Sequence, residues 1–257
     1  MWGFKAWRRR RSSSHAVLDE ALWQKVVSRF VFLRALTPGE QRRLHDLTQR
    51  FLSNKQMSGA AGLQLTDEMR TVIAAQACLL ILNLGLDYYR GWVEVIVYPG
   101  DFMPQHEYTD DDGVVHVARE PMQGEAWLQG PVILSWEAAA DSRNNQGVNV
   151  VIHEFAHKLD MLNGEPNGFP PLHQEMRREE WAQAFSAAYD DFCAQVDSGE
   201  DTAIDPYAAE NPAEFFAVLS EVFFETPLLL KRTYPQVYRQ LATFYRQEPA
   251  ARAALTQ

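Results

Sequence analysis

The chain has 257 residues, 46% of them hydrophobic, and a formal net charge of −10. This length and hydrophobic content allow one large or two small domains with a buried core. The acidic balance argues against direct nucleic-acid binding, and two distant cysteines, Cys78 and Cys193, give no sign of an exported disulfide scaffold.

The first residues, Met1–Arg11, are basic and aromatic, and a Ser-rich stretch follows them. A signal peptide would place an apolar run there, so export is not expected. The longest apolar run, 71–86, contains two amides and is too short for a membrane span. We therefore expect a flexible basic tail over 1–15, no transmembrane segment and a cytoplasmic protein.

Three helices are predicted before any strand. Apolar residues at helical intervals indicate the first over 16–35. Thr37, followed by Pro-Gly-Glu, caps a second helix that runs to about Phe51, and Thr66 caps a third, buried helix that ends near Gly85.

Strand composition follows the helices. Val93–Tyr98 and Val132–Trp136 are rich in β-branched and aromatic residues, and Asp110–Gly113 predicts a hairpin turn between two further strands. After the next motif, a helix is predicted around 174–195, and helical segments follow Pro227 and Pro235.

The segment His153-Glu154-Phe-Ala-His157 is the strongest functional signal in the chain. Histidines four residues apart on a helix point the same way, so both imidazoles can reach one metal ion. Glu154 lies about 100° round the helix, where it can take a proton from a metal-bound water. This arrangement is typical of a zinc hydrolase and predicts a peptidase.

The surroundings of the motif support a helix with two distinct sides. Asn149 can cap its start, and an apolar stripe opposite the histidines is formed by Val151, Phe155, Leu159 and Leu162. Asp160 lies on the histidine side, where it can either orient a histidine ligand or remain a surface residue.

A catalytic zinc ion needs three protein ligands and an open position for water. His173 is the one histidine after the motif, but it lies in a Pro-rich connector. Glu214 is the better candidate, on the first turn of a helix that begins with Asn211 and Pro212. Asn-x-x-Glu is also the spacing of a capping box, so the residues alone leave both readings of Glu214 open. If Glu214 is only a cap, the remaining candidates are Asp160, His173, Glu210 and Glu221.

The stretches His153–Asp160 and Tyr207–Ala217 resemble the Mlc titration factor A family, bacterial zinc metallopeptidases related to the catalytic domain of anthrax lethal factor. The layout of the family covers most of the chain apart from its two ends. Lethal factor has a glutamate four residues after its third ligand. This chain has Val218 there, so a role of that glutamate is not carried over.

The resemblance implies a complete set of site residues. His153, His157 and Glu214 would bind one Zn²⁺ per chain, Glu154 would be the general base, and Tyr207 would donate a hydrogen bond to the oxyanion.

The expected fold is α+β, mainly helical and zincin-like, with a small mixed sheet. We expect a single peptidase domain over 16–257, with a helical part to about residue 90 and a catalytic part from about residue 91. In zincin-type peptidases an edge strand pairs with extended substrate. Strand 132–136, or Trp127–Gln129 before it, is expected to be that edge.

Two functions are expected together. The first is zinc-dependent hydrolysis of peptides, which the resemblance makes aminopeptidase-like. The second, also implied by the resemblance, is binding of the transcriptional repressor Mlc, which would modulate the glucose phosphotransferase system. The alternative is a non-catalytic protein that sequesters the repressor and keeps a vestigial or regulatory zinc site.

Overall fold

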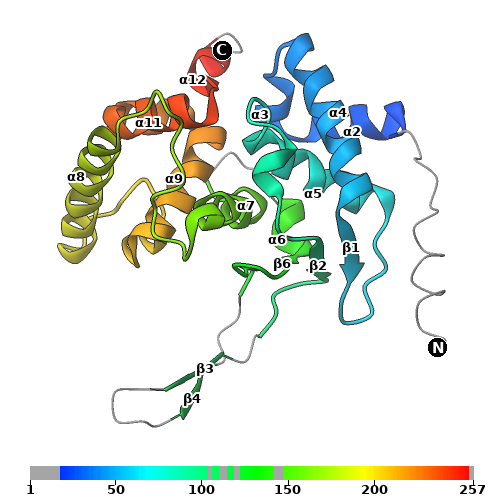
Figure 1. Ribbon diagram of the computed structural model, residues 1–257, viewed down its shortest axis with the longest axis horizontal. Coiled ribbons are helices and arrows are strands. Elements are labelled where there is room, and N and C mark those ends of the chain that lie inside the picture. Colours follow the sequence, from blue (N-terminus) through cyan, green and yellow to red (C-terminus); the bar gives the residue numbers. More distant parts are fainter. Residues whose placement is uncertain (1–17, 104–105, 110–114, 119–121, 142–146, 255–257) are drawn as a thin grey trace.

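The computed structural model describes residues 18–103, 106–109, 115–118, 122–141 and 147–254 (Figure 1). The described chain is mainly helical, with a four-stranded mixed sheet and a separate two-stranded ladder. The mainly helical α+β class is therefore confirmed. The expected tail over 1–15 and the expected turn at 110–113 lie outside the described residues.

The helices before the sheet are α2 (Glu20–Arg29), α3 (Val31–Arg34), α4 (Pro38–Asn54), α5 (Asp67–Leu80) and the 3-10 helix η1 (Leu86–Tyr89). The single helix predicted over 16–35 is wrong, because Phe30 has extended backbone and separates α2 from α3. Phe30 is fully buried, so packing of its ring outweighs helical continuity.

The caps of the next two helices are confirmed. Thr37 and Glu40 form a capping box at the start of α4, and the Thr66 hydroxyl accepts from the backbone N–H of Met69 in α5. Helix α5 ends at Leu80, earlier than predicted, and a turn carries the chain to Gly85. Helix α5 is buried along almost its whole length and packs against α4 and α7.

The strands are β1 (Gln56–Gly59), β2 (Glu94–Tyr98), β3 (His106–Thr109), β4 (Val115–Ala118), β5 (Gly124–Ala126) and β6 (Val132–Ser135). The larger sheet has the order β1-β2-β6-β5, with β1, β2 and β6 parallel and β5 antiparallel to β6. Strand β1 was not predicted, since Gln-Met-Ser-Gly lacks strand composition and pairing with β2 determines its conformation.

The described sheet has two edge strands, β1 and β5, and β5 is the one that packs against α7. The prediction that strand 132–136 is the edge is wrong, because β6 is hydrogen-bonded on both sides, to β2 and to β5. The other predicted piece, Trp127–Gln129, is not part of a strand either, because β5 ends at Ala126 and these residues form the turn to β6.

The remaining helices are α6 (Trp136–Asp141), α7 (Val150–Asp160), η2 (Met161–Asn163), α8 (Arg178–Asp197), η3 (Pro206–Ala209), α9 (Pro212–Glu225), α10 (Pro227–Thr233), α11 (Pro235–Tyr245) and α12 (Pro249–Ala254). Helix α7 lies at the centre, with α5 and the sheet on one side and α9 on the other (Figure 1). Phe155 of α7 packs against the rings of Phe51, Tyr89 and Trp92, which joins this helix to the amino-terminal core.

Candidate metal centre

Helix α7 brings His153 and His157 together, as predicted from their spacing. The helix begins at Asn149, whose side-chain oxygen accepts from the backbone N–H of Ile152 at 3.0 Å. Three members of the predicted apolar stripe, Val151, Phe155 and Leu159, are fully buried, which turns the opposite side of the helix towards α9. Leu162 was wrongly included, because α7 ends at Asp160 and Leu162 is exposed in η2. The Nε2 atoms of the two histidines are 3.1 Å apart.

Helix α9 supplies Glu214. Asn211 caps this helix by accepting from the N–H groups of Ala213 and Glu214, at 2.9 and 3.1 Å. Glu214 does not turn back towards the cap. Its Oε2 lies 2.9 Å from Nε2 of His153 and 3.4 Å from Nε2 of His157. The geometry therefore favours Glu214 as a member of the cluster over the capping-box interpretation.

Three ligand atoms, one from each of His153, His157 and Glu214, lie within 4.8 Å of one another. Within the described residues this is the group of His, Cys, Asp and Glu side chains that could hold a metal ion. Two imidazole nitrogens and one carboxylate oxygen form a donor set that suits a catalytic zinc ion with one open position. Burial raises the pKa of Glu214, but hydrogen bonds with the two imidazoles outweigh it and hold the pKa below its usual range.

Glu221 orients His153, a role that the sequence interpretation did not assign. Its Oε1 accepts from Nδ1 of His153 at 2.7 Å, and its Oε2 accepts from the backbone N–H of Asn149. A proton held on Nδ1 would leave Nε2, the nitrogen nearest to Glu214 and His157, as the atom that binds a metal ion. Glu221 follows Glu214 by two helical turns, and this spacing was the signal that could have identified it.

A buried polar network continues behind Glu221. Glu225, one turn further along α9, accepts from the side-chain amide of Asn149 at 2.9 Å and from the N–H of Gly147 at 3.2 Å. Asn149 also donates to Gln76 of α5 at 2.8 Å. Burial raises the pKa of Glu225 to about 8, so this carboxyl is largely protonated at neutral pH. The network ties the start of α7 to both neighbouring helices.

Glu154 lies buried beside the cluster. Burial raises its pKa to about 7, although the imidazoles of His153 and His157 oppose the shift. Strand β5 crosses directly over its carboxyl group. A Cβ atom at Gly124 would lie 2.6 Å from Cγ of Glu154 and would also collide with Oε1.

We expect Gly124→Ala to keep the fold and the metal site, because the atoms nearest the new methyl group belong to the side chains of Glu154 and Val150, and to lower hydrolytic activity by about 10²-fold, because Glu154 must move. Activity, bound metal and the thermal unfolding midpoint would be measured on the same samples. Gly39→Ala is the matched control, since nothing lies within 4 Å of a Cβ atom there. Undiminished activity in Gly124→Ala would show that the carboxyl position of Glu154 is not critical.

Tyr207 faces the cluster from the 3-10 helix η3. Asp205 caps η3 by accepting from the N–H of Tyr207 at 2.9 Å. The Tyr207 ring is 50% exposed, and its centroid is 6.1 Å from that of His153. Burial, together with Glu214 and Glu154, raises the pKa of Tyr207 to about 12, so its hydroxyl stays protonated and can donate a hydrogen bond.

Asp160 does not orient a histidine through any contact in the described residues. Its Oδ2 accepts from the backbone N–H groups of Asn167 and Gly168, both at 2.7 Å, so it fixes the loop after α7. Nδ1 of His157 is buried and has no hydrogen-bond partner among the described residues. The contacts of Asp160 thus give it a structural role in this loop.

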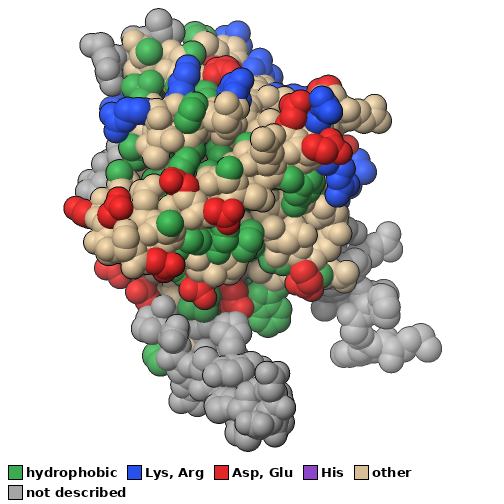
Figure 2. Space-filling view, turned by 90° about the vertical axis from the view of Figure 1, so that its left-hand side faces the viewer, with side chains coloured by type: hydrophobic (Ala, Val, Ile, Leu, Met, Phe, Trp, Pro, Cys, Tyr) green, Lys and Arg blue, Asp and Glu red, His purple; other side chains and the backbone are tan. Residues whose placement is uncertain are grey.

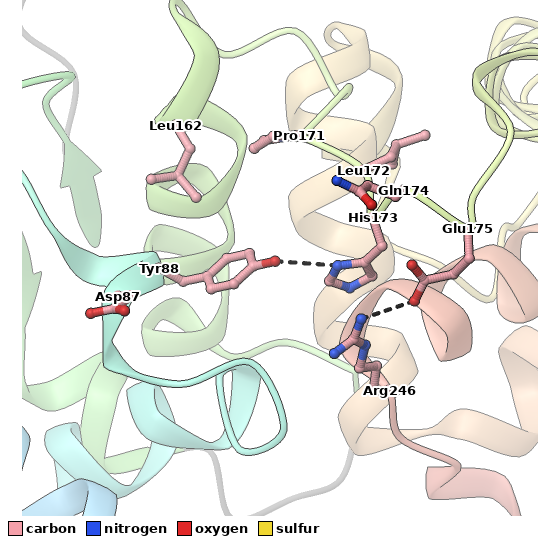
Figure 3. Close-up of a pocket in the computed structure, with 9 residues that line it drawn as sticks. All are labelled: Asp87, Tyr88, Leu162, Pro171, Leu172, His173, Gln174, Glu175 and Arg246. Carbon is pink, nitrogen blue, oxygen red and sulfur yellow. Dashed lines mark hydrogen bonds and ion pairs between the residues drawn. The ribbon is translucent and has the colours of Figure 1, made fainter.

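His173 lies outside the cluster, in a separate pocket of about 510 Å³ between η1 and the loop after α7 (Figure 3). Its Nε2–H donates to the carbonyl of Phe244 at 2.8 Å, and its Nδ1 accepts from the hydroxyl of Tyr88 at 3.3 Å. Arg246 pairs with Glu175 on the same wall. The Pro-rich connector therefore carries His173 to a structural contact.

No helix in the described part of the chain combines the length and the apolar character that a membrane crossing requires.

Comparison with known proteins defines the class. A family described as glucose-regulated metallo-peptidase M90 matches residues 4–246, so the chain belongs to this family, and membership implies a bound metal. Curated relatives bear the name Mlc titration factor A. The relative from Pectobacterium atrosepticum is 42% identical over 90% of this chain and 87% of its own length. The relative from Klebsiella pneumoniae strain 342 is 40% identical over 91% of this chain and 88% of its own length. The relative from Salmonella arizonae is 41% identical over 90% of this chain and 92% of its own length.

Proposed function

We propose that this protein is a zincin-like, zinc-dependent peptidase whose active site is the cluster on α7 and α9. The observation that carries the proposal is the convergence of His153, His157 and Glu214 beside the buried carboxyl group of Glu154. The zinc ion, when bound, supplies a Lewis acid and a water of lowered pKa. Family membership and the donor set both support this assignment.

The remaining chemistry belongs to side chains of this chain. Glu221 holds His153 in the tautomer that binds metal. Glu154 takes the proton of the attacking water and passes it to the leaving amine, a task that suits a carboxyl group whose pKa is about 7. Tyr207 donates to the oxyanion, since its hydroxyl remains protonated.

Within the described residues, no strand pairs with β5 on the side away from β6, and this edge supports an extended peptide as substrate. Gln123 O accepts from Ser135 N at 2.7 Å, and Trp127 N donates to Pro131 O at 3.2 Å. In an antiparallel pair, successive residues of a strand direct their backbone N–H and C=O groups alternately towards and away from the partner strand. Gln123 and Trp127 bond to the β6 side, so Gly124 and Ala126 direct these groups away from β6. These groups can pair with a substrate strand. Aminopeptidase-like cleavage is the narrower form of this proposal.

Metal removal tests the proposal. We expect 1,10-phenanthroline to abolish hydrolysis of alanine p-nitroanilide, and one Zn²⁺ per chain to restore it, because the three ligands converge on a single position. Zinc content would be measured by atomic emission on the same samples. Full activity in protein shown to be free of metal would refute a metal-dependent mechanism.

A second function, binding of the repressor Mlc, is favoured by the name of the relatives. The α8 side of the molecule carries many Asp and Glu side chains in its lower half, with Lys and Arg along its upper rim (Figure 2). With a net charge of −10, such a surface favours association with a basic partner such as a DNA-binding protein.

A further inference from the structure

The 3-10 helix η3, which carries Tyr207, is short, and its own hydrogen bonds do not fix its place in the molecule. The carboxylate of Asp205 accepts from Tyr207 N at the start of η3, and Tyr207 O accepts from Glu210 N at 3.1 Å at its end. Both bonds join residues of the same short segment. A helix of about one turn is marginal by itself, so contacts with other elements must set its position.

Helix α8 provides such a contact. It lies at the side of the molecule away from the sheet, next to α11 (Figure 1). The hydroxyl of Tyr189 in α8 donates to the backbone carbonyl of Ala209, the last residue of η3, at 3.0 Å. The thiol of Cys193 lies 3.9 Å from the same oxygen, and a thiol is a weak donor. Within the described residues, these are the two side chains of another helix that form a hydrogen bond with η3.

The ring of Tyr189 is itself held in place. It packs edge-on against the ring of Phe215 in α9, with the centroids 5.3 Å apart. Phe215 is buried and directly follows Glu214, the member of the cluster that α9 supplies. Tyr189 therefore contacts both segments that form the site, α9 through its ring and η3 through its hydroxyl.

The place of the Tyr207 hydroxyl depends on how η3 is held. The Tyr207 ring is half-exposed, and within the described residues no hydrogen bond holds its hydroxyl in place. The backbone of η3 must therefore determine where this hydroxyl lies relative to His153, and Ala209 is two residues further along the same turn. A donor to an oxyanion is effective only over a narrow range of positions.

We propose that Tyr189 is a positioning residue that sets the place of Tyr207 relative to the metal cluster. The inference rests on the proposed peptidase function and on the proposed role of Tyr207 as donor to the oxyanion, and it adds a residue that contacts no member of the cluster. Because the donor acts on the transition state, loss of the Tyr189 hydroxyl should lower kcat and leave KM unchanged.

The test is a double-mutant cycle on the zinc-loaded protein, with alanine p-nitroanilide as substrate. We expect Tyr207→Phe to lower kcat by about 10²-fold and Tyr189→Phe to lower it by about tenfold. In the Tyr207→Phe background, Tyr189→Phe should change kcat by less than about twofold, because no hydroxyl remains to be positioned. A tyrosine with a merely structural role would cause the same loss in both backgrounds.

Tyr234→Phe is the matched control. The Tyr234 hydroxyl also forms a hydrogen bond with α8, to Asp191 at 3.0 Å, but it makes no contact with η3 through that bond. We expect Tyr189→Phe and Tyr234→Phe to lower the unfolding midpoint by similar amounts, and only Tyr189→Phe to lower kcat. Zinc content should be unchanged in both, because Asn211 caps the start of α9 independently.

Three results would overturn the proposal and leave a peptidase in place. They are an unchanged kcat in Tyr189→Phe, an equal loss of kcat with and without the Tyr207 hydroxyl, and an equal loss of kcat in Tyr234→Phe. An unchanged kcat in Tyr207→Phe would remove the donor role of Tyr207, and this inference with it. Absence of hydrolysis by the zinc-loaded wild type would instead refute the peptidase function itself.

Discussion

Glu154→Gln should lower kcat by about 10³-fold while leaving the bound metal and the fold unchanged. Glutamine has nearly the shape of glutamate but cannot accept the proton of the attacking water. The carboxyl group is buried under β5, so water cannot easily take its place. The measurement is steady-state hydrolysis, with zinc content and the unfolding midpoint determined on the same preparations.

Glu165→Gln is the matched control for this variant, because Glu165 is exposed in the loop after α7. If Glu154→Gln retains full activity, Glu154 is not the general base. The same variant separates the two proposed functions. We expect it to bind purified Mlc as tightly as the wild type does. An inactive wild type that binds Mlc would favour the non-catalytic alternative.

Glu214→Ala should weaken zinc binding by at least about 100-fold and abolish activity, because it removes one of three ligands. Glu221→Gln should have a smaller effect, about 10-fold to 100-fold in zinc affinity, since it changes only the partner of His153 Nδ1. Competition against a chromogenic chelator would measure both affinities.

Glu210→Ala is the control for Glu214→Ala. Glu210 is an exposed acidic residue just before α9, so its removal changes the local charge without touching the cluster. Full zinc content and full activity in Glu214→Ala would remove Glu214 from the ligand set.

Local signals predicted the elements that depend on neighbouring residues. The capping box at Thr37 and the cap at Asn149 use side chains within three residues of the groups that they bind, and both are present. The helix break at Phe30 depends on burial of its ring, and strand β1 depends on pairing with the distant strand β2. No local sequence pattern predicts either feature. The edge position of β5 follows from the order of strands in the sheet, and the hydrophobic periodicity of the sequence does not predict that order.

The same distinction applies to the site. His153 and His157 face one way because of helical geometry alone, and their spacing predicted it. Glu214 comes from another helix, and the residues alone left it as either ligand or cap. Glu221 was an alternative ligand candidate in the sequence, but its contact with His153 depends on how α9 packs against α7.

The buried network around Asn149 has a consequence for motion. Glu221 and Glu225 of α9 both bind this residue of α7, and Gln76 of α5 binds it as well. Sliding or separating these helices would leave buried polar groups without hydrogen-bond partners, at a cost of about 1–3 kcal/mol for each group. The ligand-bearing helices should therefore move as one body. Movement around a bound substrate is then expected in segments outside this network, such as the short helix η3 that carries the half-exposed Tyr207.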